Sequence, residues 1–507
     1  MTAAATDVST QQTLIDALAS RGSTERIETH ISCVLLSGER ALKIKKAVNL
    51  GFLDFTTLAR RRFYCEREVE LNRPLAPSLY LGVIPITGTP DAPRIGGDGP
   101  AIEYAVEMRR FPQEALLTHV LATGRLTAAH VDQLAEEVAA FHLSTGRASG
   151  DATYGSVDQV LALAIENFTE IAPLLSGHAD RLALEALRRW TASELAAHRD
   201  AVVRRHQTGF VRACHADLHL GNIVLIDDRP TLFDCVEFNE AIRWSDVMAD
   251  VGFLTMDLID RGRPAFASRF LNRYLERTGD YDGIRVLRFY AVYRAMVRAK
   301  VAIMRAAQLD EPAERRLAVR DYRQYTRLAR RLTRSIDGGV IITQGPTASG
   351  KTTATETLVE DLHAVRVRTD VERKRLHQLA ADARTDSVLN GGIYSPDDTR
   401  RTYDALAAIV RTIVASGYVA IADGTFLRRG HRDAFVAIAR DLHVPFVILR
   451  FVVDPDVLAA RVEQRRLRGG DASEADAAVL RHQLESAEPL GPDEQRHTLT
   501  CENRENV

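Results

Sequence analysis

The hydrophobic pattern along the chain changes its period twice, and these changes separate three regions. In the first region, up to about residue 111, apolar and polar residues alternate in short β-rich runs that are typical of half-buried strands. A turn at Ser37-Gly38-Glu39 joins two of the runs into a hairpin, and a Pro/Gly-rich loop covers 88–100. The pattern predicts a small, mostly antiparallel sheet with strands at 28–36, 40–45, 80–86 and 101–108, and helices at 10–19 and 60–71.

The second region, from residue 127, has helical spacing. Its first apolar stripe follows the capping residue Thr127 and consists of Val131, Leu134, Val138 and Phe141. Further helices are predicted at 157–175, 180–205, 284–308 and 311–334.

The last of these helices, 311–334, is strongly basic. Tyr322, Tyr325, Leu328 and Leu332 form its apolar stripe, between many arginines. Arginines interleaved with tyrosines could bind RNA, but a solvated face on a helix that joins two domains is the favoured interpretation. Asp337-Gly338-Gly339 breaks the helix and marks a domain boundary.

The third region alternates β-branched runs with helical runs. Strands are expected at 340–343, 365–369, 418–422, 446–453 and 497–501, each of the first four followed by a helix. Ser395 and Pro396 give one of these helices a clear start. Such alternation predicts a parallel, doubly wound sheet, whose ligands bind at the carboxyl ends of the strands.

A phosphate-binding loop connects the first of these strands to its helix. The stretch Gly345-Pro-Thr-Ala-Ser-Gly-Lys-Thr352 matches the Walker A pattern G-x-x-x-x-G-K-[ST] in its strand–loop–helix context. Glycines let backbone N–H groups face a phosphate, the lysine reaches the β- and γ-phosphates, and the last hydroxyl holds Mg²⁺. The alternative is a glycine-rich turn that binds nothing. The residues expected to contact the nucleotide are Gly345, Ser349, Gly350, Lys351, Thr352 and Thr353, with Thr352 also a metal ligand.

Two acidic residues stand at the carboxyl ends of the next two strands, Asp370 and Asp423. Asp370 could accept a proton from an acceptor hydroxyl, and Arg373, one helical turn later, could hold an anionic acceptor. Asp423 would lie beside the phosphate loop and contact the nucleotide. Farther on, a helix with Arg461, Arg465, Arg466 and Arg468 precedes Gly469-Gly470 and could close over the transferring phosphate; a solvated arginine-rich helix is an equal alternative.

A second chemical segment lies in the middle of the chain. His215-Ala-Asp217-Leu-His-Leu-Gly-Asn222 leads into the strand 223–226, and a hairpin at 227–230 returns the chain to Asp234. The hairpin would bring Asn222 and Asp234 together as oxygen ligands for Mg²⁺, leaving Asp217 to take a proton from a substrate hydroxyl. The alternative is that these residues only cap turns, but the second aspartate after a paired strand favours kinase chemistry.

Composition limits the other possibilities. With 46% hydrophobic and 26% charged residues and a net charge of −2, the chain has no overall attraction for nucleic acid or membranes. Five scattered cysteines indicate free thiols rather than a zinc site. No apolar run approaches a membrane span and the first residues lack the order of a signal peptide, so we expect a cytoplasmic protein. A length of 507 residues suggests two or three domains.

Residues 30 to about 300 resemble the aminoglycoside phosphotransferase and choline kinase family, which has a bilobal protein-kinase-like fold. The matching residues are 215–222, Phe233-Asp234 and Asp246-Val-Met-Ala-Asp250. The turn at 37–39 departs from the family because it is not a G-x-G-x-x-G loop.

This resemblance implies roles for individual residues. Asp217 becomes the catalytic base, Asn222 and Asp234 the metal ligands, and Asp250 a brace for the catalytic loop. Lys43 becomes the lysine that contacts the α- and β-phosphates, with Glu68 as its helix partner, or Glu66. The backbone of Glu107-Met108, at the end of the last strand of the small lobe, would contact adenine.

Residues 339–490 resemble the small P-loop kinases, which include gluconate kinase, polynucleotide 5′-kinase and zeta toxins. The shared order is phosphate loop, Asp370-Val-Glu-Arg373 and the basic helix with Arg461 and Arg465.

The sequence thus predicts two domains, 1–336 and 337–507, the first protein-kinase-like (α+β) and the second an α/β P-loop domain. We expect a bifunctional ATP- and Mg²⁺-dependent phosphotransferase that acts on hydroxyls of small molecules; its oligomeric state is not indicated. Alternatives are a nucleotide-gated switch that regulates the first domain, or a C-terminal polynucleotide 5′-hydroxyl kinase, which the net charge disfavours. Glu237, Glu240 and Asp246 could form an acidic pocket for a cationic substrate, although a structural role is favoured.

Overall fold

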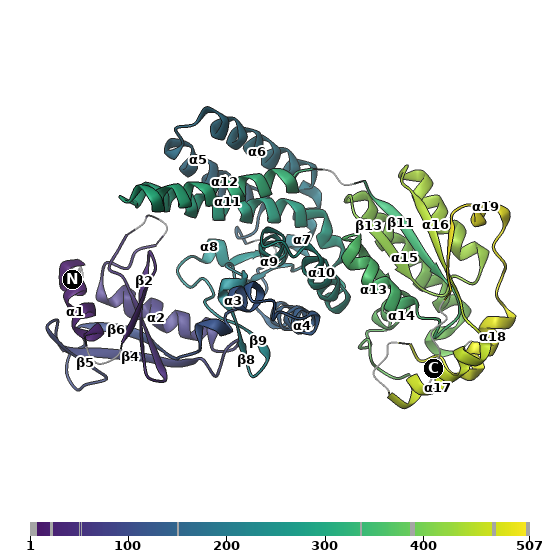
Figure 1. The fold of residues 1–507 in the computed structure, drawn as a ribbon, viewed down its shortest axis with the longest axis horizontal. Helices are drawn as coiled ribbons and strands as arrows, with labels where there is room; N and C mark the ends of the chain where they lie inside the picture. The colour runs from purple at the N-terminus through teal and green to yellow at the C-terminus, as the bar shows by residue number, and fades with distance from the viewer. Residues whose placement is uncertain are drawn as a thin grey trace. The chain divides into compact units, whose positions relative to one another are not determined.

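The computed structural model describes residues 8–20, 24–49, 51, 53–149, 152–334, 337–385, 391–468 and 473–502 (Figure 1). Its contacts divide the chain into two compact units. The first comprises Met1–Glu166 and Val202–Asp257, and the second Asn167–Ala201 and Leu258–Val507. The contacts group helices that precede residue 336 with the C-terminal sheet, so the predicted domain boundary after residue 336 remains a prediction.

The first unit begins with an antiparallel sheet in the order β1-β2-β3-β6-β4-β5. Helix α1 packs on one face through Leu14, Ile15 and Leu18, and α2 packs on the other through Cys65 and Val69. The elements are α1 (Val8–Ala19), β1 (Glu25–Glu28), β2 (Ser32–Ser37), β3 (Arg40–Lys45), α2 (Leu58–Asn72), β4 (Tyr80–Thr89), β5 (Ala92–Ile95) and β6 (Glu103–Arg109).

Alternation along β3 decides which side chains meet α2. Leu42 and Ile44 belong to the core under α1, whereas Ala41 belongs to the core under α2. Since successive strand residues point to opposite faces, Lys43 and Lys45 share the α2 side with Ala41. The strand pattern of the sequence therefore places two lysines against a helix.

Two sequence predictions in this sheet were wrong in detail. The strand expected at 28–36 is interrupted, because Thr29 makes a turn in which its Oγ1 accepts the N–H of Ser32 at 2.9 Å. The loop expected at 88–100 contains β5, which pairs with β4 as a hairpin. The apolar content of the sequence does not distinguish a strand interrupted at Thr29 from a continuous strand. It also does not distinguish a loop that contains β5 from a loop without a strand.

The rest of the first unit is mainly helical, with two short strand pairs. Thr127 caps α4 as predicted, its side chain accepting the N–H of His130. The elements are α3 (Leu117–Ala122), α4 (Ala128–Ser144), α5 (Val157–Ile171), α7 (Arg199–Gln207), β7 (Val211–Ala213) paired with β10 (Trp244–Asp246), β8 (Ile223–Ile226) paired with β9 (Arg229–Leu232), α8 (Glu240–Arg243) and α9 (Met248–Asp260). The helix expected at 180–205 is broken at His198 into α6 (His178–Ala197) and α7.

The second unit contains α6, α10 (Pro264–Thr278), α11 (Ile284–Gln308), α12 (Pro312–Leu332) and the C-terminal sheet. Helix α12 packs along α11 and buries Tyr322 and Leu328, while Arg316, Arg320 and Arg327 are exposed. The predicted apolar stripe therefore faces α11, and the arginines lie on the opposite, exposed side.

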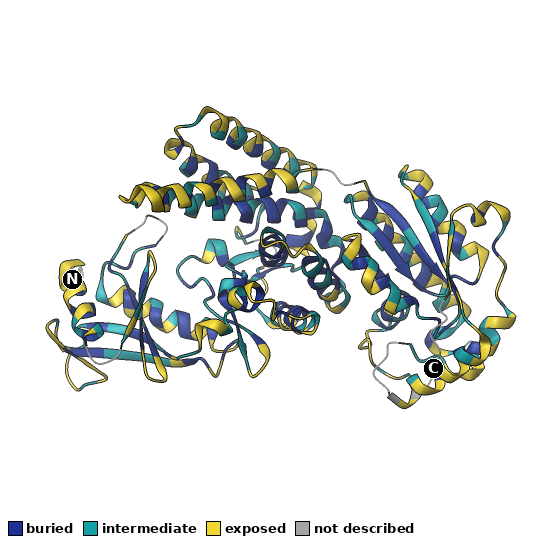
Figure 2. Cartoon of the chain, viewed as in Figure 1, coloured by how far each residue is buried: buried dark blue, intermediate teal, exposed yellow. Residues whose placement is uncertain are grey.

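The C-terminal sheet consists of five parallel strands in the order β12-β13-β11-β14-β15, as a doubly wound fold requires. Consecutive residues of its central strands, such as Ala420, Ile421 and Ala422, are all buried, so both faces are covered (Figure 2). The strands are β11 (Gly339–Gln344), β12 (Val365–Arg368), β13 (Val419–Asp423), β14 (Phe446–Val452) and β15 (Thr498–Glu502). The helices are α13 (Lys351–Asp361), α14 (Thr369–Leu376), α15 (Pro396–Ala415), α16 (Arg429–Asp441), α17 (Pro455–Arg468), α18 (Ala477–Glu485) and α19 (Pro492–Gln495).

Short 3₁₀ turns complete the described secondary structure: η1 (Gln113–Ala115), η2 (Ala172–Leu174), η3 (Leu220–Asn222), η4 (Tyr281–Gly283) and η5 (Gly392–Tyr394). Among the helices in the described ranges, none combines the length and apolar character needed to cross a bilayer.

Candidate active sites

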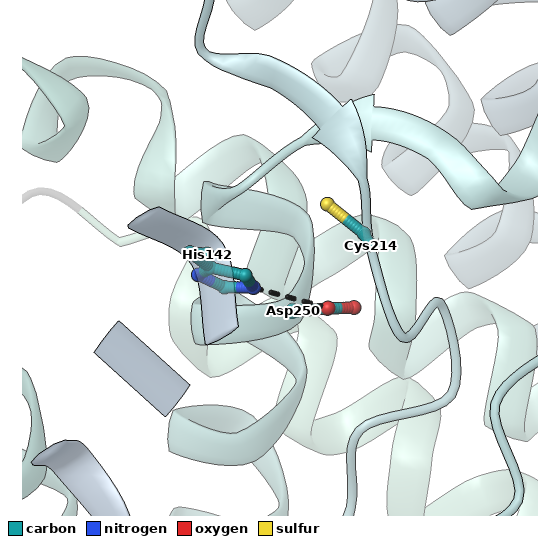
Figure 3. Close-up of side chains that lie close together, drawn as sticks. All are labelled: His142, Cys214 and Asp250. Atoms are coloured by element: carbon teal, nitrogen blue, oxygen red, sulfur yellow. Dashed lines mark hydrogen bonds and ion pairs between the residues drawn. The ribbon is translucent and has the colours of Figure 1, made fainter. Parts of the chain in front are cut away.

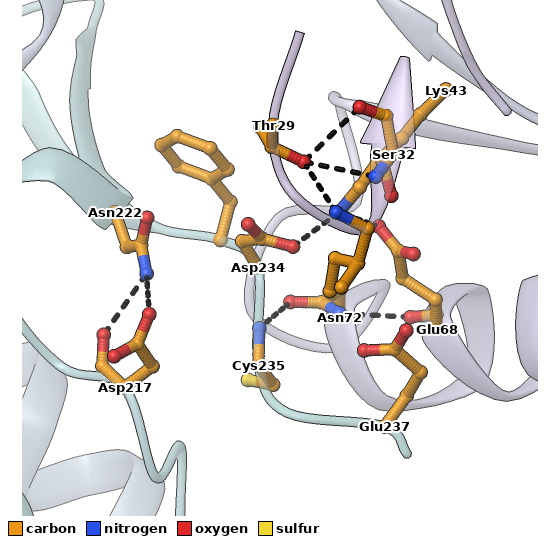
Figure 4. Close-up of polar contacts among 12 residues, drawn as sticks. Thr29, Ser32, Lys43, Glu68, Asn72, Asp217, Asn222, Asp234, Cys235 and Glu237 are labelled. Carbon is orange, nitrogen blue, oxygen red and sulfur yellow. Dashed lines mark hydrogen bonds and ion pairs between the residues drawn. The ribbon is translucent and has the colours of Figure 1, made fainter. Parts of the chain in front are cut away.

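The loop between β7 and β8 carries the first site (Figure 4). Register in the β8–β9 hairpin pairs Ile223 with Leu232, and the N–H of Phe233 donates to the carbonyl of Asn222 at 3.0 Å. Asp234 follows Phe233 directly. The backbones of Asn222 and Asp234 therefore lie at the same, open end of the β8–β9 hairpin, as the length of the hairpin in the sequence predicts.

Asp217 is held by its neighbours while its carboxylate stays accessible. The Nδ2 of Asn222 donates to the Asp217 Oδ2 at 2.8 Å and to its carbonyl at 3.0 Å. The Asp217 side chain is 39% exposed. Because the amide nitrogen of Asn222 faces Asp217, its Oδ1 is the atom left to act as a ligand. The Asp234 carboxylate comes from the same end of the hairpin. An amide oxygen and a carboxylate would together be a donor set that suits Mg²⁺.

Two carboxylates of α9 hold the backbone of this loop. Asp250 accepts the N–H of His215 at 2.7 Å and that of Ala216 at 2.9 Å, which confirms its predicted role as a brace. Asp257 accepts the N–H of Leu220 at 2.9 Å. The sequence analysis missed Asp257, although its position two helical turns after Asp250 places it on the same face of α9.

His142, Cys214 and Asp250 form a buried cluster beneath the loop (Figure 3). The three could offer ligand atoms to a metal ion, but both Asp250 oxygens already accept loop N–H groups, and His142 Nε2 lies 3.3 Å from one of them. The Cys214 thiol donates to the carbonyl of Ser245. The cluster therefore supports the loop through hydrogen bonds.

His215 contributes a further internal contact. Its Nε2–H donates to the carbonyl of Phe233 at 2.9 Å, because a carbonyl can only accept. Burial lowers the pKa of His215, which favours the neutral ring. The histidine thus joins the catalytic loop to the segment that carries Asp234.

Lys43 contacts both a helix carboxylate and the expected metal ligand. Its Nζ lies 2.8 Å from Glu68 Oε1 and 2.5 Å from Asp234 Oδ1. Glu66 is exposed and pairs with Arg62. The helix partner of Lys43 is therefore Glu68, while the phosphate-contacting role of Lys43 stays a prediction.

Lys45 is a fully buried lysine beside the half-buried Lys43, and the sequence analysis missed it. Its Nζ lies 2.7 Å from Glu68 Oε2 and also bonds to Glu237, and its side chain is fully buried. Burial by itself would lower the pKa of Lys45, but Glu237 and Glu68 raise it above its ordinary value. Its position two residues after Lys43 on a strand was the available signal, since it puts both lysines on one face.

Glu68 consequently lies between two cations. Burial would raise the pKa of this carboxyl group, but Lys43 and Lys45 lower it to about 2. The network continues into the loop after Asp234, where the N–H of Asp234 donates to the Tyr80 hydroxyl at 3.1 Å. The N–H of Cys235 donates to Asn72 Oδ1 at 2.8 Å. This loop is thus attached to α2, β3 and β4.

The contacts of Glu237 and Asp246 argue against an acidic substrate pocket at these residues, whereas the Glu240 side chain is 52% exposed. Asp246 forms a buried two-point ion pair with Arg205 at 2.7 and 2.9 Å, and Glu237 bonds to Lys45. Glu240 lies on α8 and bonds to Arg243 at 3.0 Å. The structural role that the sequence favoured for these residues is the one observed.

The adenine contact at Glu107-Met108 stays a prediction. Strand β6 continues to Arg109, and both residues lie between β3 and β4, paired on each side. Their backbone groups belong to the sheet. The N–H groups of Arg109 and Arg110 donate to the carbonyls of Leu79 and Glu39, each at 2.8 Å. The end of β6 is a boundary that the sequence pattern did not define.

The phosphate loop lies at the carboxyl end of β11. Gly350 adopts a φ of +87° immediately before α13, a conformation that glycine reaches without strain. The Lys351 Nζ donates to the carbonyls of Gly345 at 3.1 Å and Pro346 at 2.5 Å, and to Ser349 Oγ at 3.2 Å. The lysine thus lies over the loop, whereas Thr353 is exposed on α13.

Asp423 and Thr352 meet at the same edge of the sheet. The Thr352 hydroxyl donates to Asp423 Oδ2 at 2.9 Å, and the Thr369 hydroxyl donates to the Asp423 carbonyl at 2.8 Å. A hydroxyl oxygen beside a carboxylate fits the preference of Mg²⁺ for hard oxygen ligands.

Asp370 and Arg373 lie on α14, which begins directly after β12. Arg373 is buried, and its Nη1 donates to the Ile393 carbonyl at 3.0 Å and to Thr399 at 3.3 Å. Its guanidinium carbon lies 4.9 Å from the centre of the Tyr394 ring. The Arg373 Nε has no hydrogen-bond partner in the described part of the chain and is the group left for an acceptor.

Arg465 connects the basic helix α17 to the phosphate loop. Its Nη2 donates to Thr347 Oγ1 at 3.0 Å and to the Ala475 carbonyl at 2.9 Å. Arg461 lies on α17 one turn earlier. The side chains of Arg466 and Arg468 lie outside the described residues. The described contacts thus bring the predicted lid residue Arg465 to the phosphate loop.

Comparisons with known proteins agree with this division into two sites. A model of the phosphotransferase enzyme family matches residues 96–290, and a model of the AAA domain family matches residues 340–490. The chain is therefore a protein in which a kinase-like phosphotransferase domain is joined to a P-loop kinase domain. Kinase-type domains in both halves support phosphotransfer from ATP, which places the chain among the nucleotide-binding transferases.

Uncharacterized protein Rv2004c of Mycobacterium tuberculosis strain H37Rv is 32% identical over 457 residues, covering 89% of this chain and 88% of the relative. The chain belongs to the family of this protein. Among solved structures, a choline/ethanolamine kinase family protein from Mesorhizobium loti has 13% identity and a TM-score of 0.36, covering 64% of this chain and 99% of that one. A gluconokinase from Sinorhizobium meliloti 1021 has 21% identity and a TM-score of 0.23, covering 34% and 86%.

Replacing Lys45 by methionine should destabilise the first compact unit by about 3–5 kcal/mol, because Glu68 and Glu237 would lose a buried cation. The measurement is urea unfolding of the full chain, with the matched change Lys46→Met as control. Lys46 pairs with Glu28 at the surface, so its loss should stay within about 0.5 kcal/mol. Equal stability of the two variants would contradict the role of Lys45.

The protonation of Lys351 should depend on nucleotide. Burial lowers the pKa of Lys351 to about 8; Asp423 and Asp370 limit this fall, and Arg465 adds to it. Phosphates favour the charged ammonium, so ATP should bind with proton uptake at about pH 8 and more weakly as the pH rises further.

Calorimetry in buffers of different ionisation enthalpy measures this uptake. The full chain would carry Asp234→Ala, to silence the first site, and would be compared with the same chain carrying Lys351→Met. Uptake should disappear in the second protein. Equal uptake in both would show that another group titrates.

Proposed function

We propose that the chain is a bifunctional ATP- and Mg²⁺-dependent phosphotransferase, with each site transferring the γ-phosphate to a hydroxyl of a small-molecule acceptor. The observation that carries the proposal is the Asp217–Asn222 contact, which holds an accessible carboxylate on the loop that leads into the hairpin bearing Asp234. The second site has a corresponding set of residues, Asp370, Thr352 and Asp423.

In the N-terminal site, Asp217 accepts the proton of the acceptor hydroxyl as the oxygen attacks phosphorus. Lys43 orients the nucleotide phosphates, and Glu68 fixes the lysine through the contact at 2.8 Å. Asn222 and Asp234 would hold Mg²⁺, which supplies neutralisation of phosphate charge when bound. The bonds from Asp250 and Asp257 keep the base in position without reorganisation.

In the C-terminal site, backbone N–H groups of 345–351 and the Lys351 ammonium bind the phosphates. Thr352 and Asp423 would hold the cation. Asp370 accepts the acceptor proton, the free Arg373 Nε–H binds an anionic group of the acceptor, and Arg465 approaches from α17. The net charge of −2 favours a small molecule over a polynucleotide as acceptor.

Asp217→Asn should reduce N-terminal turnover by roughly 10²–10⁴-fold, since it removes a positioned general base. The measurement is acceptor-dependent ADP release by the full chain carrying Lys351→Ala, which silences the second site. Asp227→Asn is the matched control, because Asp227 is an exposed residue of the β8–β9 turn.

Nucleotide affinity should remain in the Asp217→Asn variant, as the carboxylate faces the acceptor. If this variant turned over as fast as the Asp227→Asn control with an acceptor that the parent uses, Asp217 would be a structural residue of the loop.

For the C-terminal site, a kinase and a nucleotide-gated switch differ at Asp370. Asp370→Asn should leave ATP affinity nearly unchanged and lower transfer by roughly two to four orders of magnitude. Lys351→Ala should weaken both, because it removes a phosphate contact. Both variants are measured in the full chain carrying Asp234→Ala, with Asp361→Asn, at the exposed end of α13, as control.

A switch needs no acceptor base. ADP release by the Asp370→Asn protein at the rate of its control, for every acceptor that stimulates the parent, would therefore identify the C-terminal half as regulatory.

A further inference from the structure

Helix α10 contacts the edge of the C-terminal sheet within the second compact unit. Strand β12 is the edge strand, with β13 on its other side. The Asn272 Nδ2 donates to the Ala364 carbonyl at 2.8 Å, and the Arg366 N–H donates to Asn272 Oδ1 at 2.7 Å. The side-chain amide thus makes the two bonds that a neighbouring parallel strand would make. Asn272 is buried, so this edge is closed by a helix that precedes residue 336 in the sequence.

Glu276, one turn later on α10, pairs with two arginines of β12. Its Oε1 lies 3.0 Å from Arg368 Nη1, and its Oε2 lies 3.7 Å from Arg366 Nη2. Arg366 is buried and extends to the phosphate-loop helix α13. There its Nη1 donates to the Thr352 carbonyl at 2.9 Å and to Thr355 Oγ1 at 3.1 Å.

The same turn of α10 also holds the helix that carries Asp370. The Glu276 carbonyl accepts Arg375 Nη2 of α14 at 2.5 Å. Gly279 then ends α10 with a φ of +75°, and a Cβ there would come within 2.7 Å of the Arg375 guanidinium. Glu276 is therefore connected through its side chain to α13 and through its backbone to α14.

We propose that Glu276 is a positioning residue of the C-terminal site, supplied by a helix from the preceding half of the chain. Arg366 Nη2 also lies 3.8 Å from Glu356, but the Glu356 side chain is 51% exposed and that of Glu276 only 11%, so the Glu276 carboxylate is the less solvated partner of this buried charge. Arg366 in turn fixes the carbonyl of Thr352, whose hydroxyl meets Asp423. The inference rests on the proposed function of that site. It also accounts for the joining of the two halves, because the site is complete only with α10. The mycobacterial relative aligns across both halves, over 89% of this chain.

Glu276→Gln tests this role with little change in shape. In the full chain carrying Asp234→Ala, it should weaken Mg²⁺–ATP binding by roughly 10- to 100-fold, the usual scale for residues that orient a site indirectly. Arg269→Gln is the matched control. Arg269 also joins α10 to α13, through Glu360 at 2.9 Å, but Glu360 lies in the last turn of α13, at the opposite end from the phosphate loop. Its loss should change the affinity less than about twofold.

Arg366→Lys is the second variant. A lysine keeps a cation beside Glu276 but lacks the planar fork that reaches two groups of α13. It should weaken nucleotide binding as Glu276→Gln does, without leaving a buried charge uncompensated. This variant decides the question if Glu276→Gln fails to fold, which circular dichroism and thermal unfolding report.

Calorimetric affinities for Mg²⁺–ATP distinguish the outcomes. Loss of affinity in each of these two variants that folds, Glu276→Gln and Arg366→Lys, with Arg269→Gln unchanged, supports the inference. Parental affinity in folded Glu276→Gln or Arg366→Lys overturns it, and so does an equal loss in Arg269→Gln. If the parent carrying Asp234→Ala binds no nucleotide, the proposed function of the site fails instead.

Discussion

The N-terminal site depends on two lysines, one buried and one half-buried, that lie among three carboxylates. A charge inside a protein is tolerated only with close partners, because the interior solvates it poorly. Lys43 bonds to Glu68 and Asp234, while Lys45 bonds to Glu68 and Glu237. Both lysines therefore share Glu68. Removing either lysine would leave the negative charge of this buried carboxylate less well balanced. Strand β3, helix α2 and the loop that carries Asp234 are fixed together, so the position of the expected metal ligand follows from electrostatics.

Both sites use helices as supports for loops. In the first unit, α9 holds the catalytic loop through two aspartates that accept its backbone N–H groups. In the second, α10 holds the phosphate-loop helix through Glu276 and Arg366. A helix keeps its side chains at fixed spacing, so it can hold a loop more rigidly than another loop could. The chemistry is on loops, and its precision comes from the helices beneath them.

Much of the architecture was predictable because it follows from local periodicity. The parallel sheet, the helix capped by Thr127 and the β8–β9 hairpin that brings Asn222 near Asp234 all agree with the sequence pattern. The errors concern breaks, ends and one short strand: the turn at Thr29, the helix break at His198, the extra strand β5 and the end of β6 at Arg109. These features are set by individual hydrogen bonds and by pairing between strands. The hydrophobic periodicity of the sequence contains no information about either.

The sequence by itself determined the chemistry that is available, because motif spacing fixes geometry over a few residues. It placed Lys43 and Lys45 on one face of a strand, Arg373 one turn after Asp370, and Lys351 in a loop before a helix. Only the tertiary structure decided which distant groups meet. Lys45 and Glu237 are 192 residues apart, and Arg366 and Thr352 are linked to Glu276 of α10. Partners of this kind depend on which buried faces pack together, and that is a property of the whole fold rather than of any segment.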